Sequence, residues 1–390
     1  MSTITLADLS TPSLILDRSR LLANTARMRQ RAAQLGVGLR PHMKTAKSAT
    51  IAAIAHDGAK GPVTVSTLAE ARYFAAAGFR DILYAVPVAP QKLDQAAAIM
   101  RETGCDLKLI TDHPAVAAAI AEAGRRLGLA FRVLIKIDCG LGRAGIPADS
   151  ELLLPLAAAL SAPDSATGGA VLAGVLTHAG HSYHAKDIAE IRRIAEDERL
   201  AVVTAAGRLR AAGHACPIVS VGSTPTALHA AHYDGVTEMR PGNYMFFDLF
   251  QAGVGSCRME DIAVGVLASV VAHHPGRGHL LIDAGGLALS KDTGANEHLP
   301  GTGYGRVRQP GAAQPLPGLA VHDVHQEHGL VGRQDGAAPD FAAHPPGSRL
   351  LVLPNHSCMT AAMYDRYFVV DPAQGGPDAV IAEWDRVNGW

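Results

Sequence analysis

The sequence lacks a surplus of either charge and lacks any long apolar run. Its formal net charge is −1 at pH 7, and no block of like charges occurs in its 390 residues. A basic surface for nucleic acid and a charged interaction tail are therefore not expected. No uninterrupted apolar stretch reaches the ~20 residues that span a bilayer. The N-terminal residues MSTITLADLSTPS do not show the pattern of a signal peptide. We expect neither a nucleic acid partner nor membrane association.

The chain also lacks a paired cysteine motif. Its five cysteines are odd in number and scattered, and none forms a CxxC pair. Such spacing indicates reduced thiols in a cytoplasmic protein and argues against a disulfide scaffold. The cysteines are Cys105, Cys139, Cys216, Cys257 and Cys358.

No GxGxxG follows the first apolar segment, which argues against a doubly wound nucleotide-binding sheet. Instead, short apolar runs alternate with helix patterns about eight times, as in a barrel. The runs do not alternate with polar residues, as is typical of strands buried on both faces. We predict a parallel (β/α)8 TIM barrel over residues 11–250, with an open sheet as the alternative. The predicted strands are 13–17, 37–44, 63–66, 81–88, 106–111, 131–138, 171–178, 217–223 and 237–244.

Beyond residue 250 the pattern changes. Short strand patterns are separated by Gly, Pro and Asn, and helix patterns nearly vanish. We predict an all-β domain over residues 251–390, with residues 1–10 as a candidate addition to it. The stretch 297–314 is rich in Gly and Pro, which is typical of a loop. The predicted strands are 264–274, 279–286, 349–355 and 366–370.

Lys44 lies in the segment RPHMKTAKS (40–48), between a short strand pattern and a helix pattern. Residues at the carboxyl end of a barrel strand face the mouth of the barrel, where ligands bind. An amine in that position is suited to hold pyridoxal phosphate as a Schiff base. On this segment alone, a surface lysine beside a turn is an equal alternative.

Two loops after the last predicted barrel strands have the composition of an anion site. In SVGSTPT (220–226), Gly222, Ser223 and Thr224 would present backbone N–H groups and hydroxyls to a phosphate. RPGNY (240–244) is a second such turn. Barrel phosphate sites are commonly built from the loops after the last strands.

Two further loops carry polar side chains at strand ends. CGLGRAG (139–145) contains Arg143, which could point into the site, although a solvated arginine is the simpler interpretation. THAGHSYH (177–184) contains several hydroxyl and imidazole groups. Such a density of polar groups at the rim of a barrel indicates a site lining.

The segment PNHSCMT (354–360) is the most distinctive part of the second domain. In an extended segment, His356 and Cys358 would face the same side. Imidazole and thiolate together favour zinc. Two protein ligands leave positions open for water and substrate, which suits a catalytic metal. His-x-Cys also arises by chance, and QEHG (326–329) adds a His and a Glu without a spacing argument.

Taken together, these segments resemble the fold-type III pyridoxal-phosphate enzymes of the D-serine dehydratase and D-threonine aldolase family. The resemblance runs in order along nearly the whole chain. The matching segments are TPSLILD, RPHMKTAKS, VSTLAEA, THAGHSY, SVGSTPT, RPGNYMFFD, LIDAGGLALS, QEHG and PNHSCMT.

The resemblance implies an alanine-racemase-like barrel, a C-terminal β domain and a homodimer. It implies that Lys44 carries the cofactor and that Arg143 lies beside its pyridine nitrogen, where a permanent cation disfavours protonation. It implies a divalent metal on His356 and Cys358, with zinc favoured over manganese or magnesium. The residues that it places around the cofactor phosphate and ring are Tyr183, Gly222, Ser223, Thr224, Gly242 and Asn243.

The resemblance further implies a lyase that removes water and ammonia from β-hydroxy D-amino acids such as D-serine, D-threonine or D-threo-3-hydroxyaspartate. An aldolase is the alternative. Cys358 stands where some aldolases of the family have Asp, and Ala46 stands where the family's pattern has His, and both favour the dehydratase. His181 or His184 is a candidate partner for a substrate β-carboxylate.

Two less favoured functions stay open from the sequence. An amino-acid racemase would need a second base opposite Lys44, for which Tyr304 and Tyr364 are candidates. A non-catalytic pyridoxal-phosphate carrier would share the lysine and the phosphate loops. Such carriers are single barrels, so the second domain argues against this function.

Overall fold

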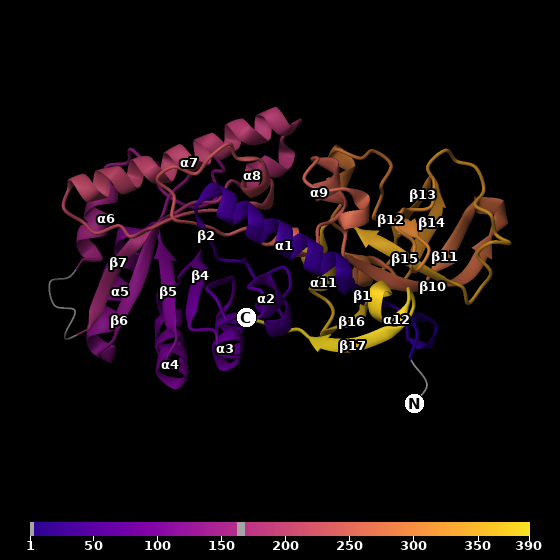
Figure 1. Ribbon diagram of the computed structural model, residues 1–390, viewed down its shortest axis with the longest axis horizontal. Helices are drawn as coiled ribbons and strands as arrows, with labels where there is room; N and C mark the ends of the chain where they lie inside the picture. The colour runs from indigo at the N-terminus through magenta and orange to yellow at the C-terminus, as the bar shows by residue number, and fades with distance from the viewer. Residues whose placement is uncertain (1–3, 162–167) are drawn as a thin grey trace. The chain divides into compact units, whose positions relative to one another are not determined.

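The computed structural model describes residues 4–161 and 168–390 and divides into two compact units (Figure 1). The barrel unit contains Arg27–Gly242 and the last residues, Val387–Trp390. The β unit contains the residues through Ala26 and Asn243–Arg386. Helix α1 (Arg18–Leu35) begins in the β unit and ends in the barrel unit. Within the described residues, no helix is long and apolar enough to cross a membrane.

The barrel unit is built on eight parallel strands in the order β2-β9-β8-β7-β6-β5-β4-β3. A parallel bridge between His42 and Thr64 joins the two ends of this order and closes the ring. The prediction of an alanine-racemase-like barrel is therefore confirmed. The strands are β2 (Gly38–Leu39), β3 (Val63–Val65), β4 (Asp81–Pro87), β5 (Asp106–Thr111), β6 (Ala130–Lys136), β7 (Gly169–Leu176), β8 (Ile218–Val221) and β9 (Glu238–Met239).

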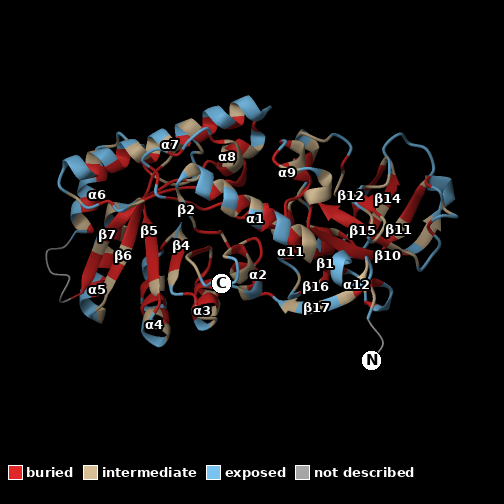
Figure 2. Cartoon of the chain, in the orientation of Figure 1, coloured by how far each residue is buried: buried red, intermediate tan, exposed pale blue. Residues whose placement is uncertain are grey.

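The helices between these strands begin and end at residues that the sequence marks clearly. The hydroxyl of Thr67 accepts a hydrogen bond from Glu70 N and caps α3, and left-handed Gly104 ends α4. In Figure 2 the barrel strands are largely buried, and α7 alternates buried and exposed residues, as expected of a helix with one face on the sheet. The helices are α2 (Ala49–Ala55), α3 (Leu68–Ala76), α4 (Leu93–Thr103), α5 (Pro114–Leu127), α6 (Leu153–Ala159), α7 (Ile188–Ala211) and α8 (Thr224–His229).

The β unit contains a nine-stranded sheet, and part of that sheet closes on itself. The order is β11-β14-β13-β12-β15-β10-β1-β16-β17, and β10 also pairs with β11. All pairings are antiparallel except that of β1 with β16. The strands are β1 (Ser13–Asp17), β10 (Val264–His274), β11 (His279–Ile282), β12 (Gly305–Arg308), β13 (Leu319–Val324), β14 (Gly329–Arg333), β15 (Arg349–Pro354), β16 (Arg366–Val370) and β17 (Val380–Asp385).

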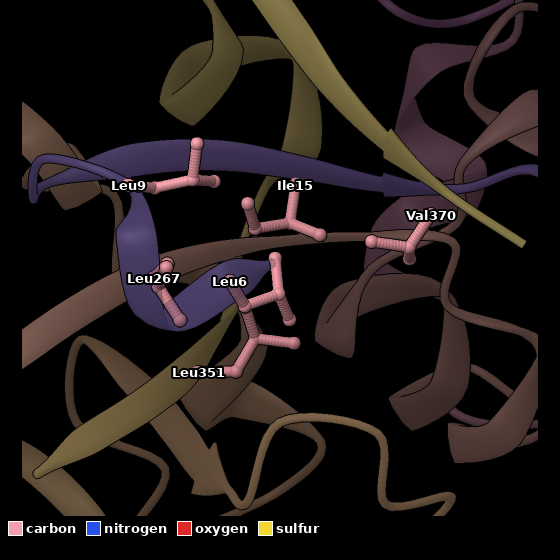
Figure 3. Close-up of a cluster of buried hydrophobic side chains, with 6 residues drawn as sticks. All are labelled: Leu6, Leu9, Ile15, Leu267, Leu351 and Val370. Carbon is pink, nitrogen blue, oxygen red and sulfur yellow. The ribbon is translucent and has the colours of Figure 1, made fainter. Parts of the chain in front are cut away.

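A hydrophobic cluster holds the N-terminal segment to this sheet (Figure 3). Leu6 and Leu9 precede β1, and Ile15 lies within it. Their partners are Leu267 of β10, Leu351 of β15 and Val370 of β16. Burial of six apolar side chains from five separate segments makes Leu6 and Leu9 an integral part of the β unit.

Two predictions for individual strands are wrong. The segment 13–17 was expected to begin the barrel, but β1 pairs with β10 and β16 of the other sheet. All five of its residues are buried, so its pattern does not distinguish a barrel strand from any other buried strand. The stretch 297–314, expected as loop, contains β12. The observed division at Ala26 and Asn243 thus differs from the expected boundaries at 11 and 250.

Candidate active site

A cavity lies at the carboxyl ends of the barrel strands, and Lys44 and Arg143 both line it. Lys44 is half-buried just after β2, whereas Arg143 remains exposed in the loop after β6. The cavity measures about 390 Å³, counting the open space at its mouth. The structure therefore brings together the two residues predicted to hold the ring of the cofactor. The other lining residues are His42, Ala85, Ile110, Lys136, Leu176, His178 and Arg240.

The charged lining of this cavity is entirely cationic. Burial, followed by the charge of Arg240, lowers the pKa of Lys136 to about 8. Burial lowers the pKa of Arg240 to about 10, although Glu238 and Glu198 act in the opposite direction. Burial, followed by the charge of Lys44, keeps the pKa values of His42 and His178 well below their ordinary range, so both rings are neutral near pH 7. A cavity with cations and no carboxylate in its lining suits an anionic ligand. Pyridoxal phosphate fits, because it brings negative charge and an aldehyde that an amine can bind.

The loop 222–226 behind this cavity is held by a buried carboxylate on α7. Glu198 accepts hydrogen bonds from Gly222 N at 3.0 Å, Ala179 N at 2.9 Å and Thr226 Oγ1 at 2.7 Å. Ser223 caps α8, where its hydroxyl accepts from Thr226 N at 3.2 Å. The carboxylate thus fixes two rim loops at once, including the loop predicted to bind phosphate.

Two predicted glycines lie where a side chain would press on neighbouring backbone. A Cβ on Gly242 would lie 2.7 Å from His42 O, and a Cβ on Gly222 would lie 3.1 Å from the backbone of Arg240. His42 and Arg240 both line the cavity. Glycine at 222 and 242 therefore allows the two loops to pack against the residues that form the cavity wall.

The remaining predicted cofactor residues are placed differently. Thr224 is buried at the first position of α8. Tyr183 lies in the short helix Gly180–His184 of the adjacent rim loop. Asn243 belongs to the β unit, where its amide donates to Asp248 Oδ2 at 2.5 Å and Ser357 Oγ at 3.2 Å. Asn243 is not among the residues that line the cavity.

In the β unit, His356 and Cys358 hydrogen-bond each other through their side chains. Burial alone would lower the pKa of His356, but Cys358 and the carboxylate of Asp292 raise it to about 11. The Nδ1 of His356 lies 3.0 Å from Asp292 Oδ2. Histidines that bind metals commonly donate one ring N–H to a carboxylate in this way. The pair fits a divalent cation, with imidazole Nε2 and the Cys358 sulfur as ligands.

The local structure of this pair differs from the prediction. His356 is extended, but it caps α11 (Ser357–Ala361), and Cys358 lies in the first turn of that helix. The two side chains meet because a capping residue and the second helical residue are neighbours, and not because a strand alternates. In the described part of the chain, no third His, Cys, Asp or Glu joins them in a metal-binding group. The Glu and His of QEHG are thus not ligands in this arrangement.

One tyrosine considered for a racemase is a poor base in this structure. The Tyr364 hydroxyl donates to Ala288 O at 3.0 Å. Burial raises the pKa of Tyr364 above its ordinary value. A phenol that is already engaged and resists ionisation does not suit proton abstraction.

Comparisons with known proteins agree with this architecture. Residues 16–249 match the alanine racemase N-terminal domain, and residues 263–370 match the putative serine dehydratase domain. The chain is 46% identical to the D-threo-3-hydroxyaspartate dehydratase of Delftia sp. strain HT23, over 99% of both chains. The structure of that enzyme matches with a TM-score of 0.93, over 99% of this chain and 100% of that one. The chain belongs to the D-serine dehydratase and D-threonine aldolase family. This family depends on pyridoxal phosphate.

Dehydratases and aldolases of the family differ in their similarity to this chain. The D-serine dehydratase of Dictyostelium discoideum is 34% identical over 93% of this chain and 94% of that one. The D-threonine aldolase of Arthrobacter sp. is 29% identical over 94% of this chain and 90% of that one. The structure of a D-threo-3-hydroxyaspartate dehydratase mutant with a cysteine replaced by alanine, in its metal-free form, matches with 45% identity and a TM-score of 0.93.

Several residues of the site were missed from the sequence. Lys136 ends β6 directly after the apolar run 133–135, and this signal was available in the segment 131–138. Asp292 lies 64 residues from His356, and no spacing pattern connects them. Glu198 lies within a long helix, and the sequence alone does not distinguish this buried glutamate from the exposed polar residues of the same helix.

Proposed function

We propose that this chain is a pyridoxal-phosphate- and divalent-metal-dependent dehydratase of β-hydroxy D-amino acids, with a 2-keto acid and ammonia as products. Its proposed substrates are D-threo-3-hydroxyaspartate, D-serine and D-threonine. The observation that carries this proposal is the 46% identity to a D-threo-3-hydroxyaspartate dehydratase over the whole chain. The cationic cavity around Lys44 and the His356–Cys358 pair supply the chemical groups that the reaction needs.

In this proposal Lys44 has two tasks. Its Nζ would hold the cofactor, and the same amine would take the proton from the substrate α-carbon. Its backbone N–H lies 3.4 Å from His42 Nδ1, so the neutral imidazole helps to orient the turn that carries the amine. When bound, pyridoxal phosphate supplies an electron sink for the α-carbon, and a divalent cation supplies a Lewis acid for the departing hydroxyl.

Arg143 and Lys136 would set the charge around the cofactor. A guanidinium is permanently protonated and disfavours a second positive charge on a nearby pyridine nitrogen. Lys136 adds a buried cation to the same cavity. These residues would hold an anionic group firmly while making its ring a weaker electron acceptor, so that a metal becomes necessary.

His356 and Cys358 would hold that metal, with Asp292 orienting the imidazole. A thiolate is a soft ligand and favours zinc over manganese or magnesium. Because a cation must displace the proton shared by the pair, we expect metal affinity to rise with pH.

A coupled assay tests this function. D-serine, D-threonine, and threo and erythro D-3-hydroxyaspartate are supplied separately, and ammonia and aldehyde are scored independently, with zinc, manganese or magnesium and after chelation. We expect ammonia without aldehyde, turnover that chelation nearly abolishes, and cofactor absorbance that chelation leaves unchanged. Release of glyoxylate or acetaldehyde without ammonia would instead identify an aldolase.

We also propose a homodimer, by analogy with the family. Light scattering of the purified protein at several concentrations measures its mass. A mass of twice 40.6 kDa is expected, and a mass of 40.6 kDa would contradict this part of the proposal.

A further inference from the structure

A second cavity lies within the β unit and combines apolar walls with three charged side chains. It measures about 410 Å³, counting the open space at its mouth. Its charged residues are Asp17, Arg20 and Arg308. Four residues of the cluster in Figure 3 form part of its apolar wall, namely Leu6, Ile15, Leu351 and Val370.

Arg308 is the unusual member of this group. It is the last residue of β12 and is only 4% exposed. Its Nε and Nη1 are buried and have no hydrogen-bond partner among the described residues. Burial and the nearby charge of Arg20 lower its pKa to about 9. A buried cation without a partner is costly, and natural proteins rarely keep one unless something neutralises it.

The one carboxylate in the cavity is already occupied by another arginine. Asp17 Oδ2 lies 3.0 Å from Arg20 Nε, and Asp17 Oδ1 accepts from Arg20 N at 3.0 Å. Arg20 is further fixed by Ile262 O, which accepts from its Nη1 at 3.0 Å. Two arginines and one aspartate leave one positive charge in the cavity, and that charge is on Arg308.

We propose that this cavity binds a monoanion with a short apolar group, that is, a short-chain aliphatic carboxylate. The carboxylate pairs with the guanidinium of Arg308, and the aliphatic group packs on Leu6, Ile15 and Leu351. One negative charge neutralises the cavity, whereas a dianion such as sulfate would bring an excess charge. Chloride would neutralise Arg308 but would leave the apolar wall uncovered. This site is independent of the proposed dehydratase reaction.

Calorimetric titration of the holoenzyme in chloride-free buffer tests the proposal, with sodium butyrate, acetate, chloride and sulfate as separate probes. We expect saturable binding that is tightest for butyrate, with a matching rise in the unfolding temperature. Arg308→Met should weaken butyrate binding by ~10-fold or more, the value of a charge-assisted hydrogen bond. Arg258→Met, at an exposed arginine of the same unit, should leave it unchanged.

Two further variants keep the test decisive if Arg308→Met does not fold. Arg308→Lys retains the charge and should retain part of the affinity. Ala312→Leu narrows the cavity without changing any charge and should weaken butyrate more than chloride. Equal affinity for chloride and butyrate, binding that survives Arg308→Met, or absence of butyrate binding by the parent would each overturn the proposal.

Discussion

The amino-terminal end of the barrel contains three cations and three carboxylates that pair with one another, whereas the cavity at the carboxyl-terminal end is lined by four cations and no carboxylate. At the amino-terminal end, Arg40 binds Asp81 at 2.6 Å and Glu238 at 2.9 Å. Lys108 binds Asp81 at 2.6 Å and Asp106 at 2.7 Å. Arg132 completes the network at 2.6 Å from Asp106.

The difference shows that one set of strands carries stabilising ion pairs at one end and a ligand-binding cavity at the other. The first residues of β4, β5 and β9 are carboxylates that pair with nearby cations and need no ligand. Those cations are Arg40, Lys108 and Arg132. The cavity lining contains no carboxylate beside its four cations, which suits an anionic ligand. Glu238 and Glu198 lie outside the lining and offset the charge of Arg240 only in part. Active sites of barrels lie at the carboxyl ends of the strands, and the charge distribution agrees with that rule.

The largest expected effect is at the carboxyl-terminal end. Lys44→Ala should lower ammonia release by ~10³-fold or more, because the variant loses both the amine that binds the cofactor and the base. Initial rates with D-threo-3-hydroxyaspartate measure this. Lys60→Ala, at an exposed lysine, is the control and should match the parent. If Lys44→Ala turned over at the parental rate, the reaction would not take place at this end of the barrel.

The next largest effect is on the pH dependence of the free energy of unfolding, and it comes from Lys136. Its pKa is about 8 in the folded chain and 10.5 ordinarily, so between these values the unfolded chain binds a proton that the folded chain lacks. The free energy of unfolding of the cofactor-free protein should therefore rise between pH 8 and 10.5, by on the order of 3 kcal/mol. Urea unfolding at several pH values measures the rise. Lys136→Met should abolish it and Lys186→Met should not; an equal rise in both variants would exclude Lys136 as its source.

At the amino-terminal end, Asp81→Asn should cost about 1–2 kcal/mol of unfolding free energy, discounted because the Asp81 side chain is 43% exposed. Turnover per folded molecule should not change. Burial raises the pKa of Asp81, but hydrogen bonds from Arg40 and Lys108 lower it below 3.8 overall. The stabilisation is thus present above pH 3.8 and is lost as pH falls below it. Asp57→Asn, in an exposed pair with Arg29, should have little effect; a comparable loss there would show that the network has no special role.

The smallest effect concerns the loops of the cavity. Glu198→Gln keeps one acceptor oxygen but loses the charge that holds Gly222 and Ala179. Affinity for pyridoxal phosphate should fall about fivefold, or ~1 kcal/mol. Absorbance titration of the cofactor-free protein measures this affinity. Glu190→Gln, on the same helix at the surface, serves as the control. If both variants bind the cofactor like the parent, Glu198 does not position the site.

Much of the fold was predictable because its strands are contiguous apolar runs bounded by turn residues. The predicted strands 106–111, 264–274 and 366–370 agree residue for residue with β5, β10 and β16. The sheet to which β1 belongs was not predictable, because a run of buried residues does not indicate which strands pair with it. Strand β12 was missed because it lies in a stretch rich in Gly and Pro.

The site was predictable where function lies in a short motif. Lys44, Arg143, Gly222, Gly242 and the His356–Cys358 pair each lie in a compact segment with its own chemistry. Partners supplied by distant segments were not predictable. Asp292 and Glu198 act through hydrogen bonds that only the folded chain creates.

Reduction of the purified holoenzyme with borohydride, followed by peptide mass spectrometry, tests most directly whether Lys44 binds the cofactor. The account predicts a yellow protein whose visible absorbance band disappears on reduction, with a pyridoxyl group attached to the peptide that contains Lys44. Absence of the band together with an unmodified Lys44, or attachment at Lys136 instead, would contradict it.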